Sequence, residues 1–446
     1  MIPQRFRGPA DALASVYTIL RASRRLKRDQ WRPAEGLALL RRDRLRRVLG
    51  RAGAAPFYRA ALLEAGLGDA GPLELDDLGR LPLVDRQVIA RHGIDAFLTV
   101  PADGLFSVAT SGSTGTPGRF LRSGREEAGY SARWMRVYDA YGCGPRDAQV
   151  NLANAGKRDR AGPVALLRRI GVLPQVERMS AAAPVGEVLA RVAALRPPIL
   201  TGYAGAIEAL ADHVLHTGAT VRPPRAVFCT AMEVTDRCLE LAERAFGAPA
   251  VDVYVTNELG VIAWSCPVRR DLLHVDDDCC IVEVLDEEGR PAPPGTVGEL
   301  VATSLELTSM PLVRYRMGDM AARIAGPCAC GRGLGLMTRV KGRTAHAIRR
   351  PGGGLIVTPV ITSLFGKAQA YEWVRGFQVR EEPGNRLRFL LDARQPPTEA
   401  QRAALTGALR SELGADFSLE LELVDAIPRA PSGKLQFLVP LPKASG

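Results

Sequence analysis

Residues 107–120 read SVATSGSTGTPGRF, and this stretch does most to decide the fold. It follows a short apolar segment ending at Val108 and holds six Ser or Thr residues and three glycines. Such a loop presents backbone N–H groups and hydroxyls to phosphate oxygens, and glycine lets the chain approach a ligand closely. No lysine follows the glycines, so the loop is not that of the P-loop nucleotidases. Alone, it is as typical of a flexible linker as of a phosphate-binding loop.

Strand and helix patterns alternate along the chain beyond this loop. PPILTGYAGAIEALADHVLHTG (197–218) reads as strand, loop and helix, and RAVFCTAMEVTDRCLELAERAFG (225–247) repeats the unit. Such units favour a sheet flanked by helices. The sequence pattern becomes typical of β-strands beyond about 275, and a smaller segment with a glycine-rich turn and alternating strands follows Gly342. We therefore predict an α/β protein with a large N-terminal domain of helix-flanked β-sheets and a β-rich subdomain (1–342), followed by a small α+β C-terminal domain (343–446).

The net charge of +11 is concentrated in residues 1–60, which hold 15 Lys and Arg against 4 Asp and Glu. Apolar residues recur at helical spacing from Leu37 to Leu49 with arginines between them. This pattern predicts an amphipathic surface helix, or a docking face for an acidic partner such as a carrier protein. Interleaved aromatics for base stacking are nearly absent, so we expect no nucleic-acid partner. Because the chain shows neither an apolar run of about 18 residues nor a secretory signal, we expect a cytoplasmic protein with no membrane partner.

Four further motifs follow the loop in order. They are Tyr254-Val-Thr-Asn-Glu258, Arg314-Tyr-Arg-Met-Gly-Asp319, Gly342-Arg343 and Pro431-Ser-Gly-Lys434. With the loop from Thr110 to Gly118, this ordered set resembles the adenylate-forming superfamily. The stretch LELDDLGRLPLVDR (73–86), the Ala231-Met-Glu233 tripeptide and the Cys-Ala-Cys at 328–330 most resemble phenylacetate–CoA ligases.

The resemblance implies ATP-dependent activation of a carboxylic acid, of the aromatic class, to an acyl-AMP with release of pyrophosphate. Transfer to coenzyme A would follow, with residues 343–446 acting as a mobile lid. The catalytic residues that it implies are Lys434, Glu258 (which would also bind Mg²⁺) and Thr114. The implied nucleotide-binding residues are Ser111, Gly112, Ser113, Thr114, Gly115, Thr116, Ala231, Glu233, Tyr254, Thr256, Asn257, Asp319 and Arg343.

The residue types suit this chemistry. A carboxylate that attacks the α-phosphate must overcome repulsion between anions, and Mg²⁺, loop donors and the Lys434 ammonium would stabilise the developing charge. Only 6 of the 59 basic residues are lysines, so a lysine in a motif loop indicates chemistry that arginine cannot replace.

A second constellation joins Cys266, His274, Cys328 and Cys330. Three thiolates and one imidazole match a closed tetrahedral zinc site, which we interpret as structural. Cys279 or Cys280 could supply an alternative ligand, and the competing interpretation is a set of unrelated buried thiols with a surface histidine.

Two positions depart from the family pattern and leave alternatives open. Ala345 stands where the hinge is usually acidic, and Asn257 stands where Ser or Thr is common. The first departure questions the thiol-transfer step, so the acceptor could instead be a carrier-protein thiol or an amine in a biosynthetic pathway. A further alternative is a zinc-containing binding module with an inactive nucleotide fold, against which the intact Glu258, Asp319, Arg343 and Lys434 argue.

Overall fold

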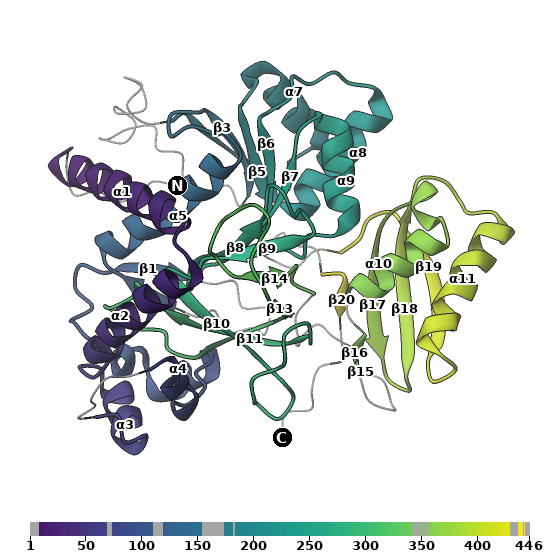
Figure 1. The fold of residues 1–446 in the computed structure, drawn as a ribbon. Helices are drawn as coiled ribbons and strands as arrows, with labels where there is room; N and C mark the ends of the chain where they lie inside the picture. The colour runs from purple at the N-terminus through teal and green to yellow at the C-terminus, as the bar shows by residue number, and fades with distance from the viewer. Residues whose placement is uncertain are drawn as a thin grey trace. The chain divides into compact units, whose positions relative to one another are not determined.

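The chain divides into two compact units in the computed structural model (Figure 1). The first comprises residues 1–317 and 321–339, and the second comprises 318–320 and 340–446. The residues that the structure describes are 9–68, 74–109, 119–153, 174–181, 183–341, 348–349, 355–356, 358–428, 436–439 and 441. The boundary predicted at 342/343 lies outside the described residues.

The first unit contains helices and strands in alternation over most of its length. Its helices are α1 (Pro9–Asp29), α2 (Ala34–Ala52), α3 (Pro56–Glu64), α4 (Arg86–His92), α5 (Gly124–Ala140), α7 (Val185–Leu195), α8 (Ala204–Thr217) and α9 (Asp236–Phe246), with the 3-10 turns η1 (Leu75–Arg80) and η2 (Ile94–Phe97). Its strands are β1 (Phe106–Ala109), β2 (Arg119–Arg122), β3 (Gln149–Ala153), β4 (Val176–Ser180), β5 (Ile199–Tyr203), β6 (Ala226–Thr230), β7 (Ala250–Thr256), β8 (Gly260–Ser265), β9 (Leu272–Val275), β10 (Cys280–Leu285), β11 (Gly298–Ser304), β12 (Tyr315–Ala321), β13 (Arg323–Ile324) and β14 (Leu336–Thr338).

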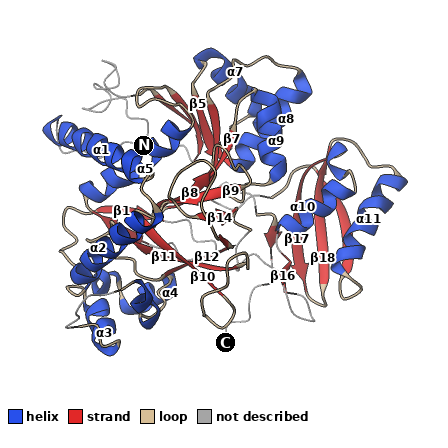
Figure 2. Cartoon of the chain, viewed as in Figure 1, coloured by secondary structure: helices blue, strands red, loops and turns tan. Residues whose placement is uncertain are grey.

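A nine-stranded sheet with the order β13-β14-β9-β8-β7-β6-β5-β3-β4 forms the centre of this unit. Strands β3 to β7 run parallel, whereas β8, β9, β14 and β13 extend the sheet in antiparallel fashion. Helices cover the parallel part on both faces (Figure 2). On β6, Val227 and Cys229 pack against α8 and α9, while Phe228 packs with Trp134 and Val137 of α5. The alternation along one strand explains why β6 is apolar throughout.

Smaller sheets complete the first unit. Strands β1 and β2 form an antiparallel pair that flanks residues 110–118, and β10, β11 and β12 form a three-stranded sheet. The predicted α/β fold with helix-flanked sheets is confirmed.

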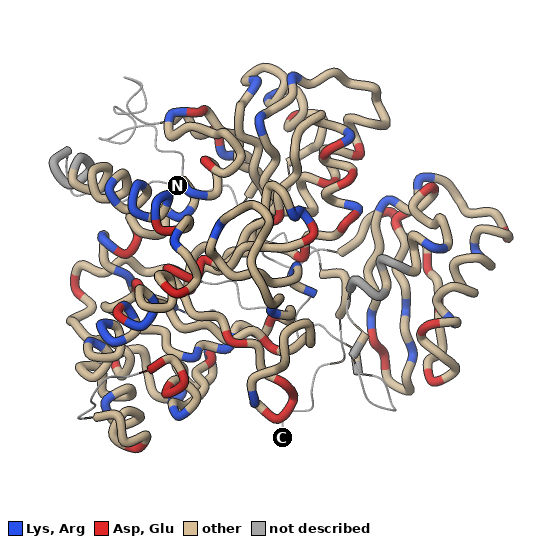
Figure 3. Tube along the Cα trace, viewed as in Figure 1, with Lys and Arg blue, Asp and Glu red and all other residues tan. Residues whose placement is uncertain are grey.

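The N-terminal helices pack on this framework. Ile19 and Leu26 of α1 are buried with Ala128 and Ala132 of α5. Lys and Arg recur along α1 and α2 (Figure 3). In the part of the chain that the structure describes, no helix combines the length and the apolar character that a bilayer-spanning segment needs.

The second unit has its own core. Its elements are β15 (Ile348–Arg349), β16 (Leu355–Ile356), α10 (Thr358–Lys367), η4 (Ala370–Glu372), β17 (Val374–Glu382), β18 (Arg386–Ala393), α11 (Glu399–Leu413), β19 (Ser418–Val424) and β20 (Leu438–Val439). The sheet order is β19-β18-β17-β20. Phe365, Phe377 and Leu409 are buried between this sheet and the two helices.

Candidate active site and cysteine–histidine cluster

The carboxyl ends of two neighbouring parallel strands bring several predicted nucleotide-binding residues to one edge of the central sheet. Strand β6 leads into Ala231 and Glu233, and the adjacent strand β7 carries Tyr254 and Thr256. Ligands of α/β proteins characteristically bind at this edge. Ala231 has a φ of 64°, in the left-handed region that an alanine rarely adopts. Such strain often marks a functional segment, which agrees with the role predicted for this tripeptide.

A tight turn after β7 positions Glu258. The backbone N–H of Leu259 donates to the Thr256 hydroxyl at 3.1 Å. Gly260 has a φ of 84°, and a Cβ on it would meet the Tyr130 ring at 2.8 Å, so glycine is required there. The turn leaves Glu258 only 5% exposed while the neighbouring Asn257 is exposed.

Arg86 is the partner of Glu258, and the sequence interpretation did not identify it. Its guanidinium Nη2 lies 2.7 Å from the Glu258 Oε1, and it also hydrogen-bonds Tyr315. Arg86 begins α4, where the Asp85 carboxylate accepts a hydrogen bond from the Val88 N–H at 2.8 Å. The Val84 N–H donates to the Arg314 carbonyl at 3.0 Å, which holds the start of α4 beside β12.

Arg122 links the predicted phosphate-loop region to the same turn. It ends β2, directly after residues 110–118, and its guanidinium donates to the Asn257 carbonyl. The side chain is 5% exposed, pairs with Glu127 at 3.5 Å and lies 5.1 Å from the centre of the Tyr130 ring. One flank of the loop is therefore fixed next to Glu258 by a buried charge.

Asp319 lies on β12, four residues beyond Tyr315, and is 4% exposed. Within the first unit, the hydroxyl of Tyr254 on β7 lies 3.5 Å from the sulfur of Met317 on β12, so these two predicted motifs are in contact there.

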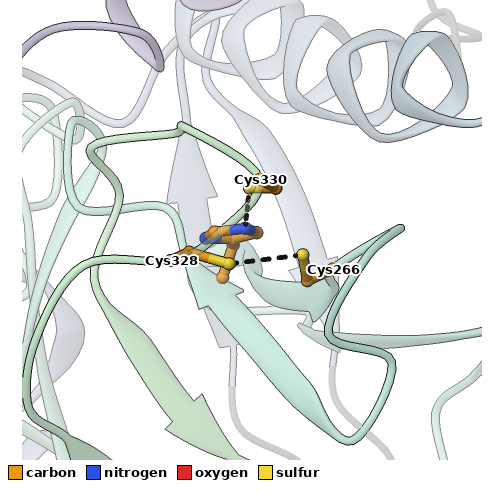
Figure 4. Close-up of side chains that lie close together, drawn as sticks. Cys266, Cys328 and Cys330 are labelled. Carbon is orange, nitrogen blue, oxygen red and sulfur yellow. Dashed lines mark hydrogen bonds between the residues drawn. The ribbon is translucent and has the colours of Figure 1, made fainter.

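The four predicted zinc ligands lie together in the first unit. One donor atom from each of Cys266, His274, Cys328 and Cys330 falls within 4.8 Å of the others. The Cys266 and Cys328 sulfurs are 3.5 Å apart, and His274 Nε2 is 3.1 Å from the Cys330 sulfur (Figure 4). Zinc–sulfur bonds of about 2.3 Å in a tetrahedron place two sulfurs about 3.8 Å apart, so the donors fit zinc.

Neighbouring groups orient the donor atoms of the cluster and set their protonation. His274 Nδ1 lies 3.4 Å from the Leu334 carbonyl, which leaves the Nε2 lone pair directed at the cysteines. Burial, with the nearby Arg332 cation, lowers the pKa of His274 to about 4, so the imidazole is neutral. The N–H groups of Val268 and Arg269 donate to the Cys266 sulfur at 3.4 and 3.2 Å.

Cys279 and Cys280, considered above as alternative ligands, lie elsewhere. Cys279 is buried with Ile19 and Leu26 of α1, and the Cys280 thiol faces the Asp276 carbonyl at 3.6 Å. Neither belongs to the donor cluster that the described residues form.

Comparisons with known proteins bear on the fold and on the class of protein. No family model matches the chain. The phenylacetate–coenzyme A ligase of Thermus thermophilus is 28% identical over 331 residues, which are 70% of this chain and 71% of that protein. A 2-hydroxyisobutyryl-CoA ligase, solved in the postadenylation state in complex with R3-HIB-AMP, superimposes with a TM-score of 0.77 at 20% identity over 93% of this chain and 91% of that one. By sequence and by fold, the chain is therefore similar to AMP-forming coenzyme A ligases. An amide bond synthetase from Marinactinospora thermotolerans also shares the fold, with a TM-score of 0.55 at 18% identity over 74% of this chain and 67% of that one.

Several of the site residues predicted from the sequence lie outside the described residues. They are Ser111, Gly112, Ser113, Thr114, Gly115, Thr116, Arg343, Ala345 and Lys434. Their roles stay predictions. Among the described residues, the site consists of a buried carboxylate at Glu258, held by Arg86 beside the edge formed by β6 and β7.

Proposed function

We propose that this protein uses ATP to convert a carboxylic acid, of the aromatic class, into an acyl-AMP and then transfers the acyl group to coenzyme A. In the first step a carboxylate oxygen attacks the α-phosphorus, and the bond to the pyrophosphate oxygen breaks. In the second step the coenzyme A sulfur attacks the acyl carbonyl, and AMP leaves. The observation that carries the proposal is the buried Glu258, held by Arg86 in the turn that follows β7, next to the strand edge formed by β6 and β7.

Glu258 would bind the metal ion, and Arg86 would orient the Glu258 carboxylate. Arg86 engages Oε1, so the second carboxylate oxygen is the one available to a hard cation such as Mg²⁺. When bound, Mg²⁺ would neutralise phosphate charge and act as a Lewis acid. Because Arg86 is charge-paired and partly buried, it fixes the direction of the Glu258 carboxylate before the nucleotide arrives.

The remaining assignments follow from the motifs. Tyr254 would stack near the adenine, Asp319 would accept hydrogen bonds from the ribose hydroxyls, and Arg343 would contact the nucleotide. The donors of residues 111–116 would hold phosphate oxygens. Lys434 would bind the acid carboxylate and the α-phosphate, where negative charge grows as the oxygen attacks.

The acceptor is coenzyme A in the relatives that support this proposal. The similar protein from Thermus thermophilus is named a phenylacetate–coenzyme A ligase, and the similar structure is a 2-hydroxyisobutyryl-CoA ligase. The amide bond synthetase with the same fold makes amine transfer the alternative to test, because Ala345 replaces the usual acidic hinge residue.

The cysteine–histidine cluster would hold a structural zinc ion. Zinc bound there would join the turn after β8, strand β9 and the loop before β14 by direct bonds. Four protein donors would fill a tetrahedral zinc site and leave no position for a substrate. Among the described residues, no carboxylate that could act as a base belongs to the cluster. All eight cysteines are free thiols, which suits the reducing cytoplasm, where we place this reaction.

Acid-dependent exchange of labelled pyrophosphate into ATP tests the proposal. The purified full chain, Mg²⁺ and a panel of aromatic, aliphatic and amino acids are sufficient. We expect exchange with a subset of aromatic acids, because the acyl-AMP forms reversibly. Exchange with no acid on the panel would contradict adenylation.

A further inference from the structure

Helix α1 presents a stripe of cationic and apolar side chains to solvent. Tyr17 is 65% exposed and Leu20 is 37% exposed, and Arg21, Arg24 and Arg28 are exposed between and beyond them. Successive residues of a helix are rotated by about 100°, so these five side chains fall within a stripe roughly 100° wide. The stripe extends about 16 Å along the helix axis. We call it the α1 stripe.

The opposite face of α1 anchors it to the rest of the first unit. Ile19, Ser23 and Leu26 are all at most 3% exposed, and the helix packs along α5. Arg25 also points inward, where it pairs with Glu306 at 2.6 Å. The α1 stripe therefore belongs to a helix whose inner face is already packed, and among the stripe's basic side chains only Arg28 pairs with a described residue, Asp29.

The charges of the α1 stripe are available to a partner. Arg21 and Arg24 form no ion pair with the residues that the structure describes, and Arg28 remains 71% exposed although it pairs with Asp29. Asp29 itself is 1% exposed, and no carboxylate is exposed among described side chains 14–34. Within residues 14–34 the described side chains thus offer exposed positive charge without an exposed carboxylate, while the exposed Asp139 of α5 pairs with Lys27 rather than with the stripe.

Trp31 lies just beyond the end of α1 and adds an aromatic surface. It is 50% exposed, and one side of its ring lies 4.5 Å from the Arg332 guanidinium, which fixes the ring in place. Tyr and Trp with leucine and arginine are the side chains that settle at the boundary between lipid headgroups and acyl chains. The aliphatic stem of arginine can follow them while its charge stays with the headgroups.

We propose that the α1 stripe and Trp31 bind an anionic lipid surface. Both the charge and the residue types fit a phosphate-rich headgroup layer above an apolar interior. An acidic protein fits less well, because a single-helix stripe is smaller than the roughly 800 Å² that each partner of a standard protein interface buries. This inference is independent of the proposed reaction, and it runs counter to the sequence-based expectation of no membrane partner.

Trp31 supplies a direct optical reporter. The other tryptophans, Trp134, Trp264 and Trp373, are at most 4% exposed. Emission that shifts to shorter wavelength on adding vesicles therefore reports the transfer of Trp31 from water to lipid. We expect the shift with vesicles containing 40 mol% phosphatidylglycerol in phosphatidylcholine, a smaller effect in high salt, and none with phosphatidylcholine alone. An equal response to both compositions, or no response to either, would overturn the proposal.

Charge reversal of the stripe tests its role in the same vesicles by co-sedimentation. Each basic residue at an anionic surface strengthens binding about fivefold, so the triple variant Arg21→Glu, Arg24→Glu, Arg28→Glu should bind at least about 100-fold more weakly. Trp31→Ser should also weaken binding several-fold with the charge unchanged. It provides a second test if the triple variant does not fold.

A matched control separates the stripe from net charge. Arg91, Arg222 and Arg410 are exposed on other elements, and their triple reversal to Glu changes the net charge equally. We expect this control to keep most vesicle binding and the stripe variant to keep its pyrophosphate exchange. An equal loss in both triple variants would show that only overall charge matters and would overturn the assignment to α1.

Discussion

The ion pair between Arg86 and Glu258 can be measured by a double-mutant cycle. Glu258→Gln removes the negative charge and keeps the side-chain shape, whereas Arg86→Gln removes the positive charge and shortens the side chain. The N–O distance is 2.7 Å, and the two side chains are 27% and 6% exposed. A hydrogen bond between charged groups contributes about 1.5–3 kcal/mol, and loss of either partner leaves a desolvated charge. We expect a coupling energy of about 2 kcal/mol, below that of a fully buried pair because Arg86 is partly solvated.

The assay is urea unfolding of the wild type, both single variants and the double variant, followed through the transition of the first unit. The pair formed by Arg316 and Glu299 is a matched control in the same region, with side chains 45% and 16% exposed. That surface pair should couple by less than 1 kcal/mol. Coupling between Arg86 and Glu258 no larger than in the control would refute our account of a fixed carboxylate.

The same variants separate structure from catalysis. Glu258→Gln should slow pyrophosphate exchange about 10²–10³-fold and raise the Mg²⁺ concentration needed for half-maximal rate. Arg86→Lys keeps the positive charge and should retain more activity than Arg86→Gln. A Glu258→Gln variant with normal Mg²⁺ dependence would remove Glu258 from the metal site.

Three further outcomes follow from the cluster, from a buried acid and from the C-terminal motif. Elemental analysis of protein purified without chelators should find about one zinc per chain, lost in Cys266→Ser and kept in Cys143→Ser; zinc-free wild type would contradict the site. Burial, opposed by Arg339, raises the pKa of Asp252 to about 7, so this carboxyl is protonated in the folded state between about pH 4 and 7 while the unfolded chain is ionised. The stability that this proton provides is lost as the pH rises through 7. Asp252→Asn should therefore raise the melting temperature more at pH 8 than at pH 5. Equal gains at both pH values would contradict the raised pKa of Asp252. Lys434→Ala should slow acyl-AMP formation about 10²–10³-fold but leave thioester formation from supplied acyl-AMP nearly unchanged in single-turnover assays, and equal damage to both steps would make Lys434 structural.

The sequence predicted those parts of the fold that rest on local patterns. The units at 197–218 and 225–247 correspond to β5 with α8 and β6 with α9. Their strands are apolar and buried, and each helix follows its strand either directly, as α8 does, or after a five-residue loop, as α9 does. The periodicity from Leu37 to Leu49 predicted α2, whose buried residues include Leu37, Leu45, Val48 and Leu49.

Contacts between distant parts of the chain were not predictable in this way. Arg86 and Glu258 are separated by 172 positions, and Arg122 and Asn257 by 135, so no spacing rule connects them. Arg44 shows the same limit. It lies in an arginine-rich amphipathic stretch that suggests a solvated face, yet it is 5% exposed and pairs with the buried Asp29 at 3.5 Å.

The four residues of the cysteine–histidine cluster could be grouped from the sequence for a chemical reason. Few residue types bind zinc, so Cys266, His274, Cys328 and Cys330 could be selected by type although they are far apart in sequence. Cys279 and Cys280 are of the same residue type, but their thiols point away from the cluster, toward α1 and toward the Asp276 carbonyl. The sequence did not define these side-chain directions.

The central claim is tested most directly by following nucleotide and acyl products in one reaction. The full chain is incubated with ATP, Mg²⁺ and an acid that supports exchange, first without and then with coenzyme A, and the products are identified by mass spectrometry. We predict acyl-AMP and pyrophosphate in the first stage, and conversion of the acyl-AMP into acyl-CoA and AMP in the second. Formation of ADP and phosphate, or an acyl-AMP that coenzyme A leaves unchanged, would contradict the account.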